Sequence, residues 1–443
     1  MWHALRTSWP LFVGMVFLMV SNGLLATLLT LRATGLGFGD SVIGLVQSAY
    51  PVGSLLGCLV APRLVIRVGH VRVFGALASL ASTAALIHLV TYDPWSWGLM
   101  RMLAGFCFAG LYVVAESWLN GRATNESRGS LLSIYFVIQT GGTAVGQLLL
   151  NLSSPEGVLL FVVVSVLISL SLVPILISAS AAPPFDVPER ISIARLFRLS
   201  PMGLTGCFLN GVAQGALYIA LALYGGAIGL DSGAIGALIG AVTLGGMLFQ
   251  FPLGRLSDRV DRRRVIVGAA GLSMVACLLL AAAGDAPLSA FGIGGLYSGV
   301  LVIGGLTLPI YSICMAHTND YLKPGQIVAA SGTLVLVLGA GIVFGPALGS
   351  YAVESHGPAG LFLLLAVIQG ATVATALFRL WRGRAPAEHP STAVAISYGV
   401  TPGAARLNPE APHNSERPAR SKATLSRSLM PGQGQAVSGE PER

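Results

Sequence analysis

Stretches of roughly twenty apolar residues recur along this chain as far as about residue 380, separated by short polar segments. A stretch of that length crosses a ~30 Å hydrocarbon layer as a helix. In lipid, each span has to satisfy its own backbone hydrogen bonds, which favours helices. The sequence therefore predicts an all-α membrane protein with twelve spans, near 9–31, 41–61, 72–92, 95–118, 130–151, 157–178, 202–228, 232–253, 264–284, 287–315, 326–353 and 357–380.

The composition agrees with lipid as the solvent for most of the surface. Of the 443 residues, 54% are apolar and 10% are charged, whereas a soluble domain carries about 25% charged residues. The formal net charge of +8 does not indicate a nucleic-acid partner, because the arginines cluster in short loops without an interleaved aromatic face. The five cysteines fall inside apolar segments without disulfide or metal-ligand spacing. We expect no metal and no cofactor.

The distribution of Lys and Arg predicts how the spans are oriented, because cytoplasmic loops are enriched in both residues. The loops of one side hold Arg32 alone, with Arg101 just inside the fourth span. The loops of the other side receive Arg6, Arg63, Arg67, Arg72, Arg122, Arg128, Arg190, Arg195, Arg198, Arg255, Arg259, Arg262, Arg263, Arg264, Lys323, Arg379, Arg382 and Arg384. The sequence therefore predicts a multi-pass protein of a bacterial inner (plasma) membrane with both termini cytoplasmic.

A short cationic segment occurs twice, each time after the second span of a set of six. The copy at 254–264 is expected to form a loop, and the degraded copy at 63–72 keeps Arg63, Leu64, Arg67, Val68 and Arg72 in register with Arg255, Leu256, Arg259, Val260 and Arg264. Weaker matches link Asn22-Gly23 with Gln214-Gly215, Gly37 with Gly229, and Gly142-x-x-x-Gly146 with Gly341-x-x-x-Gly345. These matches predict an internal duplication.

The duplication and the local composition together predict four regions along the chain. Two six-helix pseudo-repeated bundles are expected at 1–178 and 202–384, joined by a cytoplasmic linker at 179–201 that contains three prolines. The remaining residues, 385–443, are polar and rich in Pro, Ser, Gly and Ala. This tail has little to bury and is expected to be disordered.

Six plus six spans with the segment 254–264 between the eighth and ninth resemble the major facilitator superfamily over about residues 9–380. The run from Gly254 to Arg263 is similar to the signature that the superfamily carries between helices two and three. Arg101-x-x-x-Gly105-x-x-x-Ala109-Gly110 is similar to its fourth-helix signature, and Glu116-Ser117-Trp118 resembles the YcaD-like branch of bacterial facilitators. In the first-half copy, Pro62 replaces the leading glycine and Ile66 the aspartate, so the resemblance does not carry that aspartate's role into this half.

The resemblance implies a central cavity faced by helices one, four, seven and ten. Residues on those helices that would bind a substrate are Asn22, Arg101, Gln214, Tyr218 and Tyr311. The duplication places Asn22 and Gln214 at equivalent positions, so that both amides could meet one substrate from opposite sides. The alternatives are interhelical hydrogen bonds for the amides and tyrosines, and snorkelling of Arg101 to the outer interface.

A second set of residues is expected at the cytoplasmic ends of the spans. Asp258 could bond arginines or backbone N–H groups of a neighbouring helix and so hold the cytoplasmic side closed. Glu116 would be a gate partner of loop arginines, or alternatively a carboxylate that carries a proton. The set assigned to this gate is Arg63, Arg67, Glu116, Gly254, Asp258 and Arg259. The alternative for the arginines is a topology signal alone, which is how we interpret Arg262–Arg264.

These features favour a secondary transporter that moves a small organic solute by alternating access, as a monomer and with the proton as the expected coupling ion. An efflux protein for drugs or other hydrophobic compounds is the first alternative. A transporter-like sensor or scaffold that binds a ligand without moving it is the second. We predict no enzyme and no catalytic residue, because the sequence contains no nucleotide-binding glycine loop, clustered metal ligands or nucleophile elbow.

Overall fold

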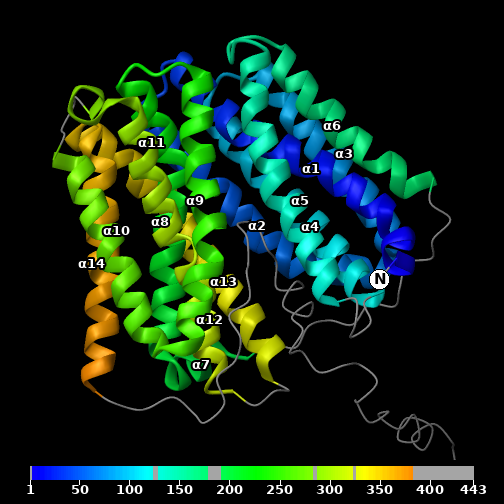
Figure 1. The fold of residues 1–443 in the computed structure, drawn as a ribbon. Helices are drawn as coiled ribbons and strands as arrows, with labels where there is room; N and C mark the ends of the chain where they lie inside the picture. The colour runs from blue at the N-terminus through cyan, green and yellow to red at the C-terminus, as the bar shows by residue number, and fades with distance from the viewer. Residues whose placement is uncertain (1, 123–127, 178–190, 283–286, 323–325, 383–443) are drawn as a thin grey trace, which may run out of the picture. The chain divides into compact units, whose positions relative to one another are not determined.

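The computed structural model describes residues 2–122, 128–177, 191–282, 287–322 and 326–382. The predicted tail, most of the linker and Lys323 lie outside these residues. Every regular element of the described chain is helical: α1 (Trp2–Gly35), α2 (Asp40–Val68), α3 (His70–Val90), α4 (Pro94–Arg122), α5 (Arg128–Leu148), the 3₁₀ turn η1 (Leu149–Leu152), α6 (Leu159–Ile177), α7 (Ile193–Leu199), α8 (Pro201–Ala227), α9 (Ser232–Arg259), α10 (Arg262–Ala282), α11 (Pro287–Thr307), α12 (Ile310–Asn319), α13 (Ile327–His356) and α14 (Ala359–Trp381) (Figure 1).

Within the described residues, eleven helical spans are long and apolar enough to cross a membrane, with α11 and α12 counted together as Gly292–Asn319. The helix α5 is not among the eleven, although its 21 residues would extend for about 31 Å. The prediction of an all-α membrane protein is confirmed. The predicted number of twelve spans exceeds this count by one.

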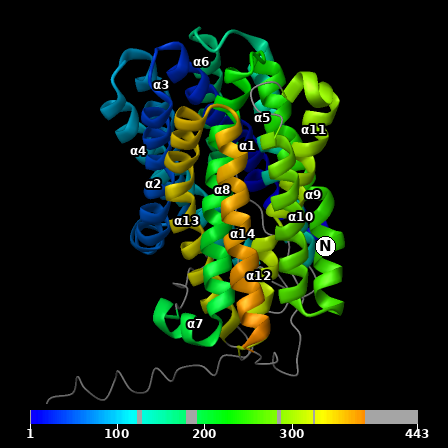
Figure 2. The same cartoon turned by 90° about the vertical axis from the view of Figure 1, so that its left-hand side faces the viewer.

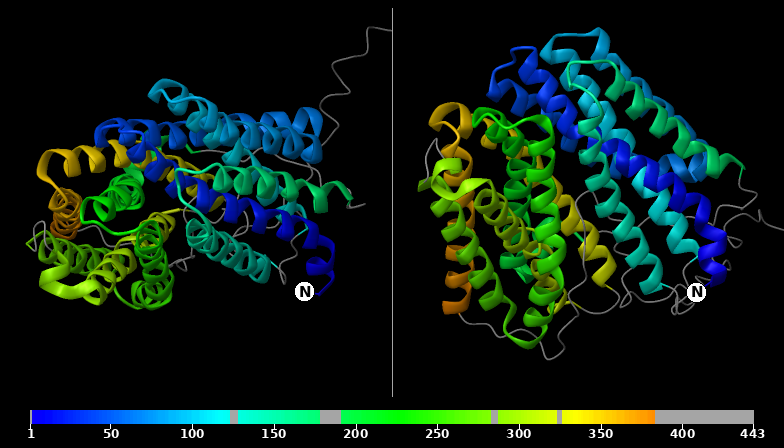
Figure 3. Two further views of the ribbon diagram at one scale, coloured as in Figure 1. Left: turned by 90° about the horizontal axis from the view of Figure 1, so that it is seen from above. Right: turned by 45° about the horizontal axis from the view of Figure 1, so that its top comes forward.

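All the described helices belong to one compact unit. The helices α1 to α6 and the helices α8 to α14 gather in two groups, blue to cyan and green to orange in both views of Figure 3. Figure 2 shows α8 flanked by α13 and α14, and these two pairs of helices are in contact. The groups meet where α2 packs against α13, α5 against α9 and α1 against α8. A site shared by both groups would therefore lie near these contacts.

The first helix of each group ends in the same way. Gly37 and Gly229 have φ angles of +79° and +80°, a conformation that glycine adopts without strain. The N–H of the residue after each glycine bonds a carbonyl five residues back, from Phe38 to Ala33 and from Leu230 to Gly225. This pattern is a Schellman cap. The two glycines matched in the sequence therefore terminate equivalent helices.

Glycines spaced by four residues also pack in equivalent ways. In the first group, a methyl group at Gly146 of α5 would overlap the backbone of Val20 in α1. In the second group, a methyl group at Gly341 of α13 would overlap the backbone of Phe208 in α8. Close backbone approach is what small residues permit between membrane helices. These contacts support the internal duplication.

Two expectations about local structure were wrong. The segment 254–264 is not a loop, because α9 continues to Arg259 and α10 begins at Arg262. Its arginines lie on the last turn of one helix and the first turn of the next. The expected tenth span is not one continuous helix, because α11 ends at Thr307 and α12 begins at Ile310. Pro309 lacks the N–H that a continuous helix would use.

Candidate functional site

A cavity lies between the two groups of helices, with a volume of about 1120 Å³ that includes the part open to solvent. Four of the five predicted substrate-binding residues line it, namely Asn22, Arg101, Gln214 and Tyr218. Tyr311 does not: its ring is 2% exposed and packs in a separate apolar cluster with Ile310 and Cys314. The cavity thus joins residues of α1, α2, α4 and α5 to residues of α8 and α9.

Asn22 of α1 holds two tyrosines on the first-half wall. Its Nδ2 donates to the hydroxyl of Tyr112 at 3.0 Å, and its Oδ1 accepts from the hydroxyl of Tyr50 at 3.2 Å. The guanidinium of Arg101 lies 4.5 Å from the centre of the Tyr50 ring, within the range of a cation–π interaction. Arg101 is 3% exposed, so it does not snorkel to the outer interface. The four side chains form one connected polar wall.

A polar stripe on α5 also faces the cavity, and the sequence analysis did not assign it to the site. Gln139, Thr140, Thr143 and Gln147 all line the cavity. Within the described residues, the Oε1 atom of Gln147 and the hydroxyl of Thr140 are buried without a hydrogen-bond partner. Polar side chains four residues apart share one face of a helix. The spacing Gln139, Thr143, Gln147 was the signal available in the sequence.

On the second-half wall, some of the polar side chains form hydrogen bonds within the protein. Gln214 donates from Nε2 to Oδ1 of Asn210 at 2.6 Å, and Asn210 donates to the carbonyl of Thr307 at 2.7 Å. That carbonyl lies at the break between α11 and α12, where regular helical bonding stops. Gln214 therefore supports the helix break as well as lining the cavity. The rest of this wall combines the polar side chains of Tyr218, Thr243 and Gln250 with the apolar side chains of Ile219, Ile239, Met247 and Leu308.

Glu116 of α4 is fully buried and belongs to a hydrogen-bonded chain that starts at the cavity. Gln139 donates from Nε2 to the hydroxyl of Tyr135 at 3.1 Å, and this hydroxyl donates to Oε1 of Glu116 at 2.9 Å. The exposed fraction of Glu116 is 0%. Arg63 and Arg67, the expected gate arginines of α2, are exposed near the end of their helix.

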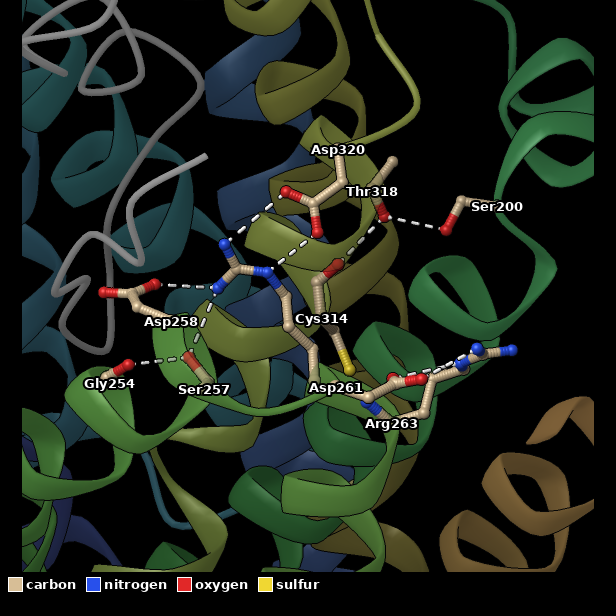
Figure 4. Close-up of polar contacts among 10 residues, drawn as sticks. Ser200, Gly254, Ser257, Asp258, Asp261, Arg263, Cys314, Thr318 and Asp320 are labelled. Atoms are coloured by element: carbon tan, nitrogen blue, oxygen red, sulfur yellow. Dashed lines mark hydrogen bonds and ion pairs between the residues drawn. The ribbon is translucent and has the colours of Figure 1, made fainter. Parts of the chain in front are cut away.

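A cluster of charges, here called the α9–α10 cluster, is centred on Arg262. Its Nε donates to Oδ2 of Asp320 at 2.8 Å, and its Nη1 donates to Oδ1 of Asp258 at 3.0 Å and to Ser257 at 3.2 Å. In Figure 4, Asp258 and Ser257 lie at one side of this cluster, and Asp320 lies at the other side. The side chains of Arg262 and Asp320 are both 4% exposed. Arg262 is therefore more than a topology signal.

The residues predicted around Asp258 have different surroundings in this cluster. Arg259 is exposed. Gly254 is buried, and its carbonyl accepts a bond from the hydroxyl of Ser257 at 2.8 Å. The ion pairs of Arg262 join α9, α10 and the residue that follows α12, all in the second group of helices. Sequence spacing matched Arg259 to the first-half copy but did not show which arginine turns inward.

Between α9 and α10, Asp261 forms a second ion pair of the cluster. Its carboxylate accepts from the guanidinium of Arg263, with an N–O distance of 2.8 Å. Partial burial acts to raise the pKa of Asp261, but the side-chain and backbone hydrogen bonds from Arg263 outweigh it and hold the pKa below the usual value. Arg263 also donates to the carbonyl of Arg379 at 3.0 Å, which fixes the end of α14.

Replacing Asn22 with alanine is expected to weaken solute binding by about tenfold, because it removes both hydrogen bonds that orient Tyr50 and Tyr112. The protein should remain folded, since the two hydroxyls can be hydrated from the cavity. Binding is measured by ligand-induced thermal stabilisation of the purified protein. Asn151→Ala is the matched control, because Asn151 is exposed and does not line the cavity. Unchanged affinity in Asn22→Ala would contradict the role of this wall.

Membrane-length helices in two equivalent groups, with a polar cavity between them, define a class of membrane transporters. The comparisons with known proteins place the chain within this class. The model of the Major Facilitator Superfamily matches residues 11–231 and 203–428. The chain belongs to the major facilitator superfamily, a family of transporters rather than enzymes, and is a multi-pass bacterial membrane protein.

Relatives and solved structures agree with this assignment. The chain is 29% identical over 364 residues to the "Uncharacterized MFS-type transporter YcaD" of Salmonella newport (strain SL254), covering 81% of this chain and 92% of that protein. It belongs to this YcaD-like branch, as the sequence predicted. The structure of the nucleoside transporter NupG matches with a TM-score of 0.68 and 14% identity, over 85% of this chain and all (100%) of that one. The human organic anion transporter MFSD10 (TETRAN) matches with a TM-score of 0.57 and 15% identity, over 84% and 99%; both show a shared fold.

Proposed function

We propose that this protein is a secondary transporter that moves a small organic solute by alternating access. The observation that carries the proposal is the central cavity, because its walls come from both groups of helices. A site between two repeated halves becomes accessible from either side when the halves rock around it. The solved structures with the same fold are a nucleoside transporter and an organic anion transporter by name, which is consistent with a small organic solute.

We propose that α5 is the twelfth span and that both termini are cytoplasmic. The support is the length of α5, its packing between α1 and α9, and the arginine asymmetry of the sequence. In this orientation the starts of α2 and α9 and the ends of α5 and α13 lie on the outer side. We likewise propose the two-bundle division, a monomer, and a gating role for the cytoplasmic residues assigned from the sequence.

With that orientation, the closest contacts between the halves lie at the outer end. The backbone N–H of Ser41 in α2 donates to Oε2 of Glu354 in α13 at 2.8 Å. A methyl group at Gly44 would lie 2.6 Å from Ser350, and one at Gly236 of α9 would lie 2.9 Å from the carbonyl of Gln147 in α5. We infer that the cavity is closed to the outside and that this conformation faces the cytoplasm.

We propose the proton as the coupling ion, with Glu116 as its carrier. The support is the chain from the cavity through Gln139 and Tyr135 to this buried carboxyl group. A proton taken up by Glu116 would neutralise a charge whose burial is costly. Binding of solute beside Gln139 would then influence whether Glu116 keeps its proton.

Glu116→Gln is expected to remove the acceleration of uptake by an imposed pH gradient while leaving solute exchange in place, because the amide cannot take up a proton. A solute identified by thermal stabilisation of the purified protein is followed into proteoliposomes with and without the gradient. Asp93→Asn is the control, since this carboxylate is exposed at the start of α4. A pH response that survives in Glu116→Gln contradicts this carrier. The absence of flux for every solute that binds contradicts transport itself and favours a sensor.

Export of hydrophobic compounds is a second candidate function. The observation that favours it is the apolar part of the second-half wall, with Ile219, Ile239, Met247 and Leu308. Accumulation of a lipophilic dye inside inside-out vesicles would support export. Flux confined to polar solutes would exclude it.

A further inference from the structure

We propose that the start of α10 and the end of α14 form a binding site for the phosphodiester headgroup of an anionic phospholipid. The site, here called the α10–α14 site, consists of Arg264, Phe378, Arg379, Trp381 and Arg382. It lies outside the cavity, and its occupant is independent of the transported solute. Three observations carry the proposal: the position of these residues at the lipid surface, the charge of the three arginines, and a difference from the first group of helices.

Arg264 lies on the side of α10 that meets lipid. Leu272, Val275 and Leu279 follow it at helical spacing and are 62%, 49% and 59% exposed. Residues at this spacing share one side of a helix, and α10 is one of the spans of membrane length. Apolar side chains exposed within a span meet acyl chains. Arg264 belongs to the first turn of α10, so it lies where this side of the helix reaches the lipid headgroups.

The end of α14 adds two more arginines at the same place. The helix α14 runs beside α10 (Figure 1), and Nη1 of Arg263 donates to the carbonyl of Arg379 at 3.0 Å. Phe378 and Trp381 are exposed on the last turn of α14, as is typical of aromatic residues at the membrane interface. The guanidinium carbons of Arg382 and Arg379 lie 4.6 Å and 5.9 Å from the centre of the Phe378 ring. Both cations are therefore held against an aromatic ring at the level of the headgroups.

The three arginines have no described carboxylate to neutralise them. The carboxylate between α9 and α10, Asp261, pairs with Arg263 at 2.8 Å. Neither Arg264, Arg379 nor Arg382 forms an ion pair with a described residue. A guanidinium presents its donors in a planar fork that fits a phosphate in bidentate geometry. The phosphate of an anionic lipid therefore complements both the charge and the hydrogen-bonding groups of this site.

The first group of helices shows that the site is more than a topology signal. Arg72 of α3 is in register with Arg264 and is also exposed. The helix packed beside α3 is α6, which the duplication makes equivalent to α14. The last turn of α6 holds no basic residue and no aromatic residue. One arginine is thus present at the equivalent place in the first group, whereas the second group adds two arginines and two aromatic rings.

Matched lipids that differ in headgroup charge test this proposal. The full chain is purified in detergent and titrated with phosphatidylglycerol, with phosphatidylcholine of the same acyl chains, and with soluble glycerol phosphate. Native mass spectrometry counts the bound molecules, and thermal stabilisation gives the affinity. Phosphatidylglycerol is expected to bind at least about tenfold more tightly than phosphatidylcholine. Glycerol phosphate should not bind at the same concentration, because it lacks the acyl chains that would lie along α10.

Variants show whether the α10–α14 site sets this preference. Replacing Arg264, Arg379 and Arg382 together with glutamine should abolish the preference for phosphatidylglycerol, and each single replacement should weaken binding by about fivefold. Phe378→Leu keeps every charge and should also weaken binding, because it removes the ring on which two of the arginines stack. Thermal unfolding without lipid establishes that each variant is folded.

The matched control removes the same charge from exposed positions elsewhere, on α3 and α7, by replacing three arginines with glutamine: Arg72, Arg195 and Arg198. It should keep the preference for phosphatidylglycerol. Equal binding of the two lipids, a preference that survives in the triple variant of the site, or an equal loss in the control would overturn the proposal. Glycerol phosphate that binds as tightly as the lipid would show a site for a soluble phosphate and would overturn the assignment to a lipid.

Discussion

Replacing Arg262 with alanine is expected to lower the free energy of unfolding by about 3 kcal/mol, because it removes the charge-assisted hydrogen bonds that its guanidinium donates to the buried carboxylate of Asp320. Both side chains of this pair are 4% exposed. The contact with Asp258 adds less, since that carboxylate is 33% exposed and exposed pairs contribute little. Unfolding of the purified protein is measured either at equilibrium in mixed micelles or by thermal denaturation.

Arg264→Ala is the matched control for this prediction, because Arg264 is an exposed arginine two residues along the same helix. It should unfold as the wild type does. The double variant Arg262→Ala with Asp320→Asn should recover part of the loss, since it no longer buries the charge that Arg262 compensated. Equal stability of Arg262→Ala and Arg264→Ala would return Arg262 to a topology signal.

Gly105→Ala is expected to cost about 1–3 kcal/mol in stability and to abolish solute binding, because a methyl group there would overlap the carbonyl oxygen of Tyr50. The helices α2 and α4 would have to separate. Tyr50 and Arg101 lie on the two helices at this contact, so their stacking would be lost with it. Unfolding and calorimetric binding are measured on the same purified sample.

Gly98→Ala is the matched control, because it also replaces a glycine of α4. At this position nothing lies within 4 Å of the added methyl group. It should bind solute normally and unfold no earlier than the wild type. If Gly105→Ala binds solute with wild-type affinity, the close approach of α2 and α4 does not position the cavity wall.

The fold was largely predictable, because span length and a repeated motif depend on the sequence alone. The equivalence of Gly37 and Gly229 is an example: a positive φ after a helix restricts the residue at each site. The break at Pro309 was also readable, since proline in a span removes a helical hydrogen bond. It was missed because the flanking residues are apolar enough to suggest one continuous span.

The site was predictable only in part, because which face of a helix turns inward is decided by its neighbours. Asn22 and Arg101 were assigned from the family resemblance and do line the cavity. Tyr311 follows the break after Thr307 and packs in an apolar cluster instead. The α5 stripe was not assigned to the site, since sequence spacing does not distinguish a cavity from a partner helix. The choice of Arg262 over Arg259 likewise depends on the position of Asp320.

The outer contacts between the halves have a consequence for the balance between conformations. Besides the bond from Ser41 to Glu354, they are formed by glycines against backbone and small side chains, with Gly44 beside Ser350 and Gly236 beside Gln147. Such contacts immobilise few rotatable bonds, so forming them sacrifices little side-chain entropy and breaking them recovers little. The two conformations would then differ in free energy by only a few kcal/mol, a difference that the binding of one small solute can reverse.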